Sequence, residues 1–337
     1  MSKKGNLSDK KLSRRKIFRG VILILGIVLV FAAVLLVIRH FENKQGEVTL
    51  PVASDSVVMY NGVEYKKKNN TETLLVMGLD KYESASTDDE SYTNDRQSDF
   101  LMLFVIDNDA KTCTAVHINR DTMADINVLG LAGETVNTVN KQIALAHTYG
   151  NGGRISCQNT VNSVSDLFGN LKVNHYISVT MDTVPEINDL VGGVQVTVLD
   201  DFSGIDDTLV KGEEVTLMGD HALTYVRTRY QLDDSSNKNR MERQRQYINA
   251  LVDKTRECAA NDDTFILNTL TTVSDNLVSD CTITQLDTLF DKLSTYEFMP
   301  VYTIDGEYVT GEKHMEFYAD EDSIKKTVME LIYEPVA

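Results

Sequence analysis

An uncharged run of eighteen residues, VILILGIVLVFAAVLLVI at positions 21–38, restricts the architecture of this chain more than any other feature. As an α-helix this run is ~27 Å long, about the thickness of the hydrocarbon core of a bilayer. Eight Lys and Arg residues precede it, and such an excess of positive charge keeps an N-terminus in the cytoplasm. We therefore expect a basic cytoplasmic tail over residues 1–20, a transmembrane helix over residues 21–38 and an extracellular remainder.

A cleaved signal peptide is the alternative for this segment. The apolar run exceeds the usual hydrophobic region of a signal peptide, and no clear A-x-A cleavage site follows it. We therefore predict an uncleaved signal-anchor and a single-pass protein of the cell membrane. Residues 39–70 are polar and lack a long apolar period, so we expect them to form an extracellular linker.

Charge is distributed unevenly along the chain. Residues 1–39 hold nine basic residues and one acidic residue, whereas the rest holds 24 basic and 49 acidic residues. An acidic exterior argues against nucleic acid as a partner, because phosphate backbones bind Lys and Arg. The 42% of apolar residues is enough for a packed core and excludes wholesale disorder.

The Cys and His residues form no motif that would indicate a catalytic or metal site in this sequence. The four Cys residues are too few for a disulfide-built miniprotein, and the absence of a C-x-x-C pair argues against zinc. Disulfide pairing and free thiols both remain open. The six His residues are scattered, and we expect His117, inside an apolar run, to be a core residue.

Short apolar runs alternate with amphipathic segments after residue 70. This alternation predicts an α/β domain over residues 71–337, in which helices cover both faces of a central mixed sheet in three αβα layers. We expect strands at residues 73–79, 100–106, 113–118, 175–179, 194–199 and about 298–303. We expect helices at residues 138–149, 156–168, 220–226, 240–258, 264–278, 283–293 and 322–332.

Acidic and Arg residues recur at the ends of the predicted strands. Asp80 follows the first strand, Arg96 and Asp99 lie at the entry of the second, and Arg120 and Asp121 follow the third. Each residue alone is typical of a turn or a surface salt bridge. Their recurrence favours a functional site, because ligands of open α/β sheets bind at strand ends. No G-x-x-x-x-G-K-[ST], G-x-S-x-G or H-E-x-x-H motif is present.

A second group consists of Arg227, Arg229, Arg240, Arg243 and Gln244. The first two share a side if their segment is extended, and the last three share a face of a helix. Converging guanidinium groups repel one another unless an anion lies between them, and Arg matches phosphate oxygens bidentately. Spare carboxylates beside them suit Mg²⁺ or Mn²⁺. The pattern indicates a di- or polyphosphate site, with a salt-bridged helix surface as the alternative.

Seven motifs in a fixed order, LLVMGLD, RQSDF, NRDT, KQIALA, LVGGV, HALTYVRTR and RMERQ, resemble the LytR-CpsA-Psr family over residues 73–255. The resemblance implies a Gram-positive cell-envelope enzyme. Such an enzyme transfers a glycopolymer, for example teichoic acid or capsule, from a polyprenyl-pyrophosphate carrier to a peptidoglycan hydroxyl and leaves a phosphodiester. The resemblance also implies an apolar tunnel for the lipid tail, with a lining that the sequence does not assign.

The resemblance assigns roles to individual residues of this chain. It implies Mg²⁺ ligation by Asp80 and Asp99, and catalytic roles for Asp99, Arg120 and Asp121. Either Asp99 or Asp121 could accept the proton of the hydroxyl. It implies pyrophosphate contacts from Arg96, Arg120, Lys141, Arg227, Arg229, Arg240, Arg243 and Gln244, of which Lys141 and Arg243 are the weaker matches.

The chain departs from the family pattern at three places. Asn119 stands where a Pro usually precedes the Arg-Asp pair, and Asn237 stands where an Asp often lies three residues before Arg240. Lys81 and a long acidic insert at residues 82–95 replace a shorter loop that bears an Arg. Two other functions remain open. A polyprenyl-pyrophosphate hydrolase would use the same residues, with water in place of the sugar hydroxyl. A non-catalytic membrane-tethered binding or regulatory protein would instead need the acidic and Arg residues to be structural ion pairs.

Overall fold

The computed structural model describes residues 56–80, 97–130, 132–150, 153–232, 234–312 and 314–336. The predicted basic tail, the predicted transmembrane helix, residues 39–55 of the predicted linker, the acidic insert and Arg96 lie outside these residues. Within the described ranges, no helix has both the length and the apolar character needed to cross a bilayer.

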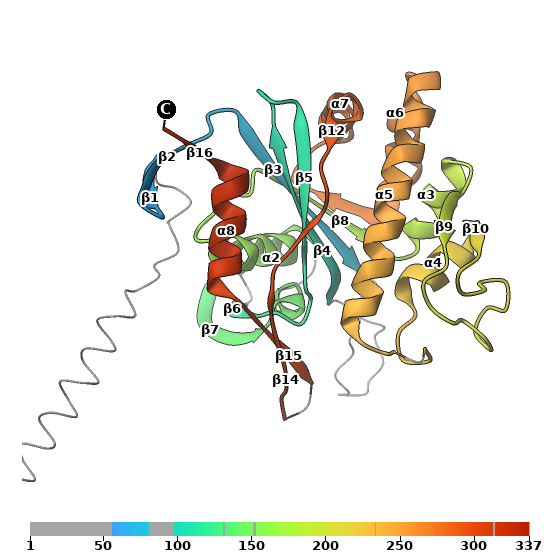
Figure 1. Ribbon diagram of the computed structural model, residues 1–337, viewed down its shortest axis with the longest axis horizontal. Coiled ribbons are helices and arrows are strands. Elements are labelled where there is room, and N and C mark those ends of the chain that lie inside the picture. The colour runs from blue at the N-terminus through green and yellow to red at the C-terminus, as the bar shows by residue number, and fades with distance from the viewer. Residues whose placement is uncertain are drawn as a thin grey trace, which may run out of the picture. The chain divides into compact units, whose positions relative to one another are not determined.

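A seven-stranded mixed sheet forms the centre of the described domain (Figure 1). β3 and β8 are parallel, β4 is antiparallel to both β3 and β5, and β11 is antiparallel to β8. The short strands β12 and β13 run parallel to β5. The prediction of a mixed central sheet is confirmed. The strands are β3 (Thr71–Leu79), β4 (Ser98–Asp107), β5 (Thr112–Ile118), β8 (His175–Thr180), β11 (Leu277–Ser279), β12 (Glu297–Phe298) and β13 (Tyr302–Thr303).

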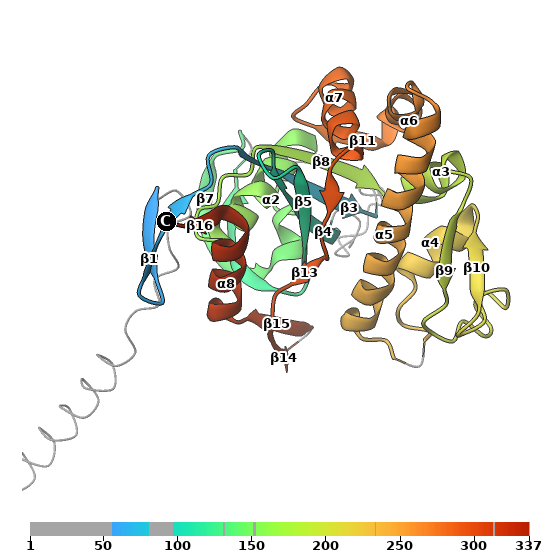
Figure 2. The same cartoon turned by 45° about the horizontal axis from the view of Figure 1, so that its top comes forward.

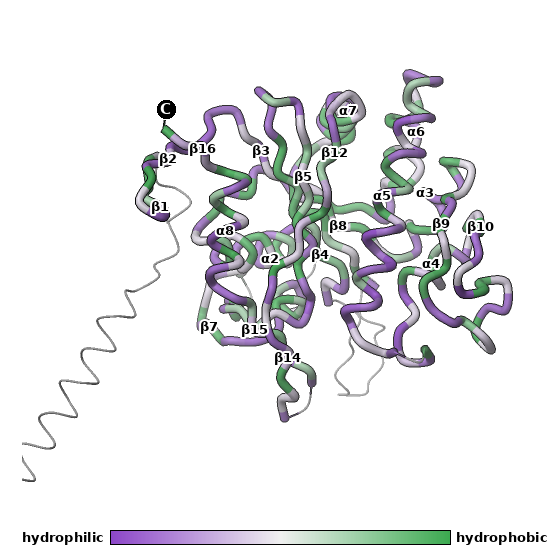
Figure 3. Tube along the Cα trace, in the orientation of Figure 1, coloured by the Kyte–Doolittle hydropathy of each residue, from purple (hydrophilic) through white to green (hydrophobic). Residues whose placement is uncertain are grey.

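Helices cover both faces of this sheet (Figures 1 and 2). α2 (Gly153–Leu167) and α8 (Glu321–Ile332) pack on one face, and α5 (Asn237–Asn261), α6 (Phe265–Thr272) and α7 (Ile283–Ser294) pack on the other. The central strands are therefore buried on both sides, which explains the long apolar runs in β3 and β4 (Figure 3).

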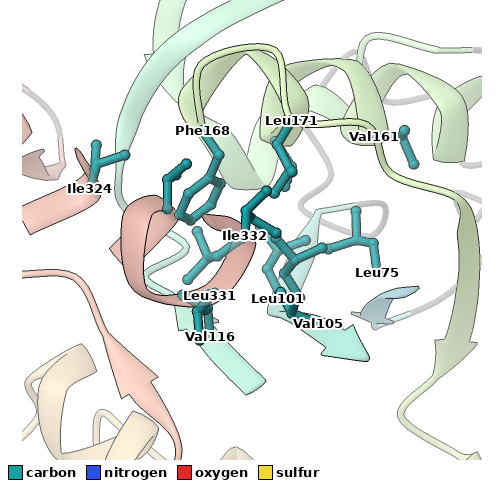
Figure 4. Packing of buried hydrophobic residues seen from close by; sticks show 14 of the residues in the cluster. Leu75, Leu101, Val105, Val116, Val161, Phe168, Leu171, Ile324, Leu331 and Ile332 are labelled. Atoms are coloured by element: carbon teal, nitrogen blue, oxygen red, sulfur yellow. The ribbon is translucent and has the colours of Figure 1, made fainter. Parts of the chain in front are cut away.

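Neighbouring residues of β3 illustrate the two faces. Leu75 joins a cluster with Val161 of α2 and Ile324 of α8 (Figure 4). Leu74, one residue earlier, packs in the opposite cluster with Ile266 of α6. Because side chains alternate along a strand, consecutive leucines stabilise two separate hydrophobic cores.

A smaller lobe lies beside α5. It consists of α3 (Thr183–Leu190), the antiparallel pair β9 (Val194–Thr197) and β10 (Glu214–Leu217), and α4 (Asp220–Arg227). Its apolar core contains Val196, Phe202 and Tyr225, with Tyr247 of α5 closing it. α5 therefore contacts both this lobe and the central sheet.

Side chains at the helix ends explain where several helices begin. The Ser236 hydroxyl accepts the N–H of Asn239 at the start of α5, and the Asp320 carboxylate accepts two N–H groups at the start of α8. Thr282 and Gln285 form a reciprocal capping box at the start of α7. These caps satisfy backbone donors that have no partner within the helix.

The predicted helix at residues 138–149 is wrong. Its first half belongs to strand β7 (Thr135–Gln142), which forms a hairpin with β6 (Met123–Leu129), and only the short 3₁₀ helix η1 (Ile143–Ala146) follows. Thr, Val and Asn are weak helix formers, so pairing with β6 overrides a marginal helical period. The predicted helix at 264–278 likewise ends early, because η2 (Ser274–Asn276) and β11 follow α6.

The end of the predicted linker is also ordered into strands. β1 (Val57–Tyr60) and β2 (Val63–Lys67) form a hairpin, and β2 also pairs with β16 (Tyr333–Pro335), the last strand in the sequence of the domain. A further hairpin, β14 (Gly306–Thr310) and β15 (Met315–Ala319), lies against the residues that follow β5. Sequence alone offered no indication of these long-range pairings.

Candidate functional site

A β-bulge positions Asp99. Gly78 of β3 pairs with Phe100 of β4, whereas the next residue, Leu79, pairs with Ser98, so Asp99 has no partner across the ladder. Such an extra residue re-aims a side chain and is frequent beside active sites. A Cβ atom on Gly78 would lie 2.9 Å from the Cβ of Phe100, which explains why this position is a glycine.

Arg120 follows β5 and is held by three acceptors. Its Nη1 forms an ion pair with Asp99, its Nη2 donates to the side-chain oxygen of Gln97, and its Nε lies 3.5 Å from Oδ1 of Asp121. With these contacts on several sides, the planar guanidinium has a defined orientation. The predicted neighbours Asp99, Arg120 and Asp121 therefore meet in space.

Asp121 is the most buried carboxylate of the group, with 4% exposure. Its Oδ1 accepts a hydrogen bond of 3.1 Å from Gln142, and its backbone N–H donates to Asn119. Burial raises the pKa of Asp121, although the nearby Arg120 opposes the shift. This carboxylate is therefore a stronger proton acceptor, when ionised, than an ordinary Asp.

Three arginines from distant parts of the chain act on one another electrostatically. Burial, and after it the charge of Arg240, lowers the pKa of Arg120 to about 10. Burial, and after it the charge of Arg229, lowers the pKa of Arg240 to about 10. Partly desolvated cations that repel one another favour binding of an anion between them. The structure thus brings Arg120, Arg229 and Arg240 together, and we call these three residues the arginine cluster.

Arg227 lies at the side of this cluster. It is the last residue of α4 rather than part of an extended segment, so the condition under which Arg227 and Arg229 would share a side is not met. Its half-exposed guanidinium lies 3.3 Å from Oδ1 of Asp80, which follows β3. Arg229 donates from Nε to the backbone oxygen of Ser235 and lies over the ring of Tyr230.

A chain of hydrogen bonds positions Arg240. Its Nη2 donates to the side-chain oxygen of Asn237 at 2.7 Å, and the amide of Asn237 donates to the side-chain oxygen of Asn119 at 2.7 Å. The amide of Asn119 in turn donates to the hydroxyl of Tyr308 at 2.6 Å. We call Tyr308, Asn119 and Asn237 the amide relay. It connects the β14–β15 hairpin to the arginine cluster.

Two further predicted phosphate ligands, Arg243 and Lys141, lie in different surroundings from each other. Arg243 is 1% exposed, and its guanidinium contacts Asp200 and the backbone oxygen of Thr228. Its placement differs from the predicted pyrophosphate contact, because these groups hold it inside the smaller lobe beside the ring of Phe202. Lys141 is exposed on β7, and its neighbour Gln142 is the residue that reaches Asp121.

An apolar cavity of about 340 Å³ begins beside the cluster. Side chains of β3, β4 and β8 line one wall, and side chains of α3, α5, α6 and α7 line the other. Gly78 and Gln244 belong to this lining, two residues from Asp80 and four residues along α5 from Arg240 respectively. The buried Gln244 therefore lines the apolar cavity one helical turn from Arg240 of the arginine cluster.

The carboxylates fit a hard divalent cation by their donor atoms. Oδ1 of Asp80 and Oδ1 of Asp99 are buried and accept no hydrogen bond from the described residues, while each faces an arginine. Carboxylate oxygens are the ligands that Mg²⁺ and Mn²⁺ prefer. Binding a cation would leave Arg227 and Arg120 free to contact phosphate oxygens.

A sequence profile of the LytR_cpsA_psr family matches residues 36–332. The chain belongs to the LytR-CpsA-Psr family. A relative from Enterococcus faecalis, the polyisoprenyl-teichoic acid--peptidoglycan teichoic acid transferase TagU, is 31% identical over 261 residues, which cover 75% of this chain and 78% of the relative. The transferase TagV of Bacillus subtilis is 29% identical over 245 residues, which cover 68% of this chain and 57% of TagV.

Solved structures of LytR-CpsA-Psr relatives share the fold. The structure of TagT bound to LI-WTA superposes with a TM-score of 0.59 at 21% identity and covers 78% of this chain and 90% of TagT. The crystal structure of B. subtilis TagV superposes with a TM-score of 0.57 at 25% identity and covers 78% of this chain and 97% of TagV. The resemblance read from the seven motifs is thus confirmed.

The structure adds residues that sequence reasoning missed within this LytR-CpsA-Psr domain. Gln97 and Gln142 hold Arg120 and Asp121, and both lie inside motifs that were already recognised. Tyr308 contacts Asn119 from 189 residues away, so nothing in its sequence context could have indicated this role. Two of the three departures from the family pattern, Asn119 and Asn237, prove to be hydrogen-bond partners.

Proposed function

We propose that this protein is a membrane-anchored phosphotransferase that moves a glycopolymer from a polyprenyl-pyrophosphate carrier to a hydroxyl group of peptidoglycan. The observation that supports it most is that the lining of the apolar cavity includes Gln244, one helical turn along α5 from Arg240, and Gly78, two residues before Asp80. A donor with an apolar tail and a doubly charged head matches this pairing. The curated relatives named above act on teichoic acid and peptidoglycan and are transferases, which supports the class of enzyme.

Binding of the donor would follow the polarity of the site. The polyprenyl tail occupies the cavity between sheet and helices, where its apolar surface leaves water. The pyrophosphate lies at the mouth, and Arg120, Arg229 and Arg240 contact its oxygens, with Arg227, Gln244 and Arg96 as further contacts. Asp80 and Asp99 would hold Mg²⁺ or Mn²⁺, and the ion would neutralise negative charge on the phosphate oxygens.

The transfer step makes one bond and breaks one bond. The acceptor hydroxyl oxygen attacks the phosphorus that carries the glycan, and the oxygen bridging the two phosphorus atoms leaves with polyprenyl phosphate. Negative charge grows on the bridging and equatorial oxygens, which the arginine cluster stabilises without reorganising at the moment of reaction. The hydroxyl proton passes to a carboxylate, Asp99 or Asp121.

Anchoring fits such a donor. A polyprenyl carrier is confined to a bilayer, so tethering the enzyme by residues 21–38 raises its effective concentration at that surface. With the N-terminus in the cytoplasm, the domain that follows would face the peptidoglycan.

The test is to incubate the purified full-length chain with a short lipid-pyrophosphate glycan, Mg²⁺ and peptidoglycan fragments. The proposal expects a phosphodiester-linked product and release of polyprenyl phosphate. Free phosphorylated glycan without linkage to peptidoglycan would instead identify a hydrolase. Retention of the unreacted donor at the site would identify a binding protein, and the transferase proposal would be wrong.

A further inference from the structure

Three potential metal ligands meet at the end of the sheet that lies away from the arginine cluster. His175 begins β8, and Asp280 and Cys281 directly follow β11, the antiparallel partner of β8 (Figure 2). Nδ1 of His175 lies 3.2 Å from Oδ2 of Asp280 and 3.2 Å from Sγ of Cys281. We call these three residues the edge triad.

The edge triad is separate from the proposed transferase site. Leu74 of β3 pairs with His175, and Asp80 lies six residues further along the parallel strand. At about 3.3 Å per residue, this register separates the two sites by roughly 20 Å. The triad also belongs to different elements, because neither β11 nor the start of α7 contributes a residue to the arginine cluster.

The distances between the ligand atoms fit one tetrahedral ion. Zinc bonds of about 2.0–2.1 Å to nitrogen and oxygen and about 2.3 Å to sulfur place nitrogen about 3.3 Å from oxygen and about 3.5 Å from sulfur. The observed separations are 3.2 Å in both cases, and all three ligand atoms lie within 4.8 Å of one another. Small side-chain movements would therefore complete the coordination geometry.

Hydrogen bonds already fix the backbone that presents these ligands. The other carboxylate oxygen of Asp280 accepts the backbone N–H of Tyr176 at 2.9 Å, which aims Oδ2 at His175. The hydroxyl of Ser279 accepts the N–H of Cys281 and donates to the backbone oxygen of Tyr176. Thr282, the next residue, is locked by the capping box of α7. A preorganised ligand set binds a metal with a smaller entropic cost.

Nδ1 of His175 has two neighbours at the same distance, the Asp280 carboxylate and the Cys281 sulfur. Nδ1 of a neutral imidazole carries at most one proton, so it can donate to the Asp280 carboxylate or to the Cys281 sulfur but not fully to both. A cation at the centre would satisfy all three groups at once and stabilise the thiolate.

From this geometry we propose that His175, Asp280 and Cys281 bind a zinc ion, with water in the fourth position. The mixture of imidazole, thiolate and one carboxylate suits zinc and excludes Mg²⁺ and Ca²⁺, which prefer oxygen ligands. His175 and Asp280 are about one-third exposed, so the ion can enter from solvent. The ion would fasten the edge strand β11 and the start of α7 to β8.

The absence of a C-x-x-C pair concealed this site in the sequence. His175 lies on β8, whereas Asp280 and Cys281 follow β11 and are 105 and 106 positions away in the chain. Only the antiparallel pairing of β8 with β11 brings these residues together. Spacing motifs such as C-x-x-C detect only zinc sites in which pairs of ligands are close together in the sequence.

The test uses the full-length chain, stripped with a chelator and titrated with Zn²⁺ and, separately, with Co²⁺ as a spectroscopic probe. The proposal expects one tightly held ion per chain, a thiolate-to-cobalt charge-transfer band and a rise in Tm on zinc addition. Cys281→Ala and His175→Ala should each weaken zinc binding at least about tenfold and abolish the Tm rise. Affinity should also fall as the pH is lowered, because the thiol must lose its proton.

Matched controls are available in the same chain. His221 and Asp206 form a comparable His–Asp pair, which no third ligand of the described residues joins, and Cys258 is a half-buried thiol elsewhere. His221→Ala and Cys258→Ala should bind zinc like the unaltered chain. Loss of binding in these controls, or zinc that dialyses away equally from all variants, would overturn the proposal. Because His175 is partly exposed, His175→Ala gives a folded variant should Cys281→Ala not fold.

Discussion

Asn119 and Asn237, which lie 118 residues apart in the chain, are joined by a buried hydrogen bond of 2.7 Å between their side chains. Asn119 precedes Arg120, and Asn237 begins α5 and accepts from Arg240. One amide pair therefore adjoins two members of the arginine cluster. A Pro at 119 could form no side-chain hydrogen bond, so the two substitutions relative to the family pattern belong together.

This relationship predicts coupled effects on catalysis. Asn237→Ala removes the side-chain oxygen that accepts from Arg240 and the amide that donates to the side-chain oxygen of Asn119. Leaving these buried groups without their partner should cost about 1–3 kcal/mol of free energy. We expect a lower kcat with a smaller change in KM. In a double-mutant cycle with Asn119→Ala, the coupling free energy should be about 0.5–3 kcal/mol. Additive losses in the transfer assay would show that the pair does not act as a unit.

Arg120→Lys should lower the transfer rate strongly although the positive charge remains. Lys cannot reproduce the planar fork that contacts Asp99, Gln97 and Asp121 together. We expect a loss of roughly 2–4 kcal/mol in transition-state stabilisation, measured as kcat/KM with the lipid-linked glycan. Arg154→Lys on the exposed start of α2 is the matched control and should leave the rate unchanged. Equal rates for both variants would remove Arg120 from the mechanism.

A divalent cation should be required for transfer. Asp80 and Asp99 would bind it, so a chelator should abolish activity and added Mg²⁺ or Mn²⁺ should restore it. Asp99→Asn should raise the Mg²⁺ concentration needed for half-maximal rate, because the amide is a weaker ligand than a carboxylate. Full activity in the chelator would contradict the proposed metal site, and the zinc-free His175→Ala variant keeps the edge triad from confusing the result.

Filling the apolar cavity should weaken binding of the lipid-linked donor without changing binding of inorganic pyrophosphate. Val252 lines the cavity from α5, and a Trp there would occupy space that the polyprenyl tail needs. For Val252→Trp we expect binding of the lipid-linked donor to weaken about tenfold or more, with unchanged binding of inorganic pyrophosphate. Val210→Trp, at an exposed position of the smaller lobe, is the control. Calorimetry with both ligands measures the difference, and parallel losses would refute it.

His117 should make folding stability depend on pH. It is 2% exposed against Phe100, and burial lowers its pKa from 6.5 to about 3. Because the unfolded chain then binds the proton more tightly, the stabilising contribution is present above pH 6.5. It is lost as the pH falls toward 3, by up to about 1.4 kcal/mol per pH unit.

Denaturant unfolding at pH 7 and pH 5 checks this expectation. The stability of His117→Phe relative to the unaltered chain should improve at the lower pH, since Phe does not titrate. A constant difference between the two proteins would show that His117 does not contribute to the pH dependence.

Much of the fold could be predicted because burial on both faces leaves a strong pattern. β3 and β4 contain the unbroken apolar runs LLVMGL and FLMLFVI, and α7 and α8 have clear amphipathic periods. The weakly patterned segment at residues 138–142 was misassigned, because its conformation depends on pairing with β6. His117 was correctly expected in the core.

The candidate site divides in the same way. Asp99 lies in a motif at the entry of one strand, and Arg120 and Asp121 lie in a motif at the end of the next. Their proximity in space could therefore be predicted. Arg243 could not be separated from Arg240 by helical spacing, because its inward contact with Asp200 depends on how the smaller lobe packs. The roles assigned to these residues stay predictions until the assays above are done.

The sequence by itself determined the family and which strongly patterned segments form strands or helices. It also indicated arginines suited to bind an anion and carboxylates suited to bind a cation. These properties follow from local side-chain chemistry and periodicity, which neighbouring residues express without help from the rest of the chain. Only the tertiary structure decided the bulge at Asp99, the amide relay and the edge triad. Each depends on contacts between residues far apart in the chain, and such contacts arise only when strands take their register and helices pack.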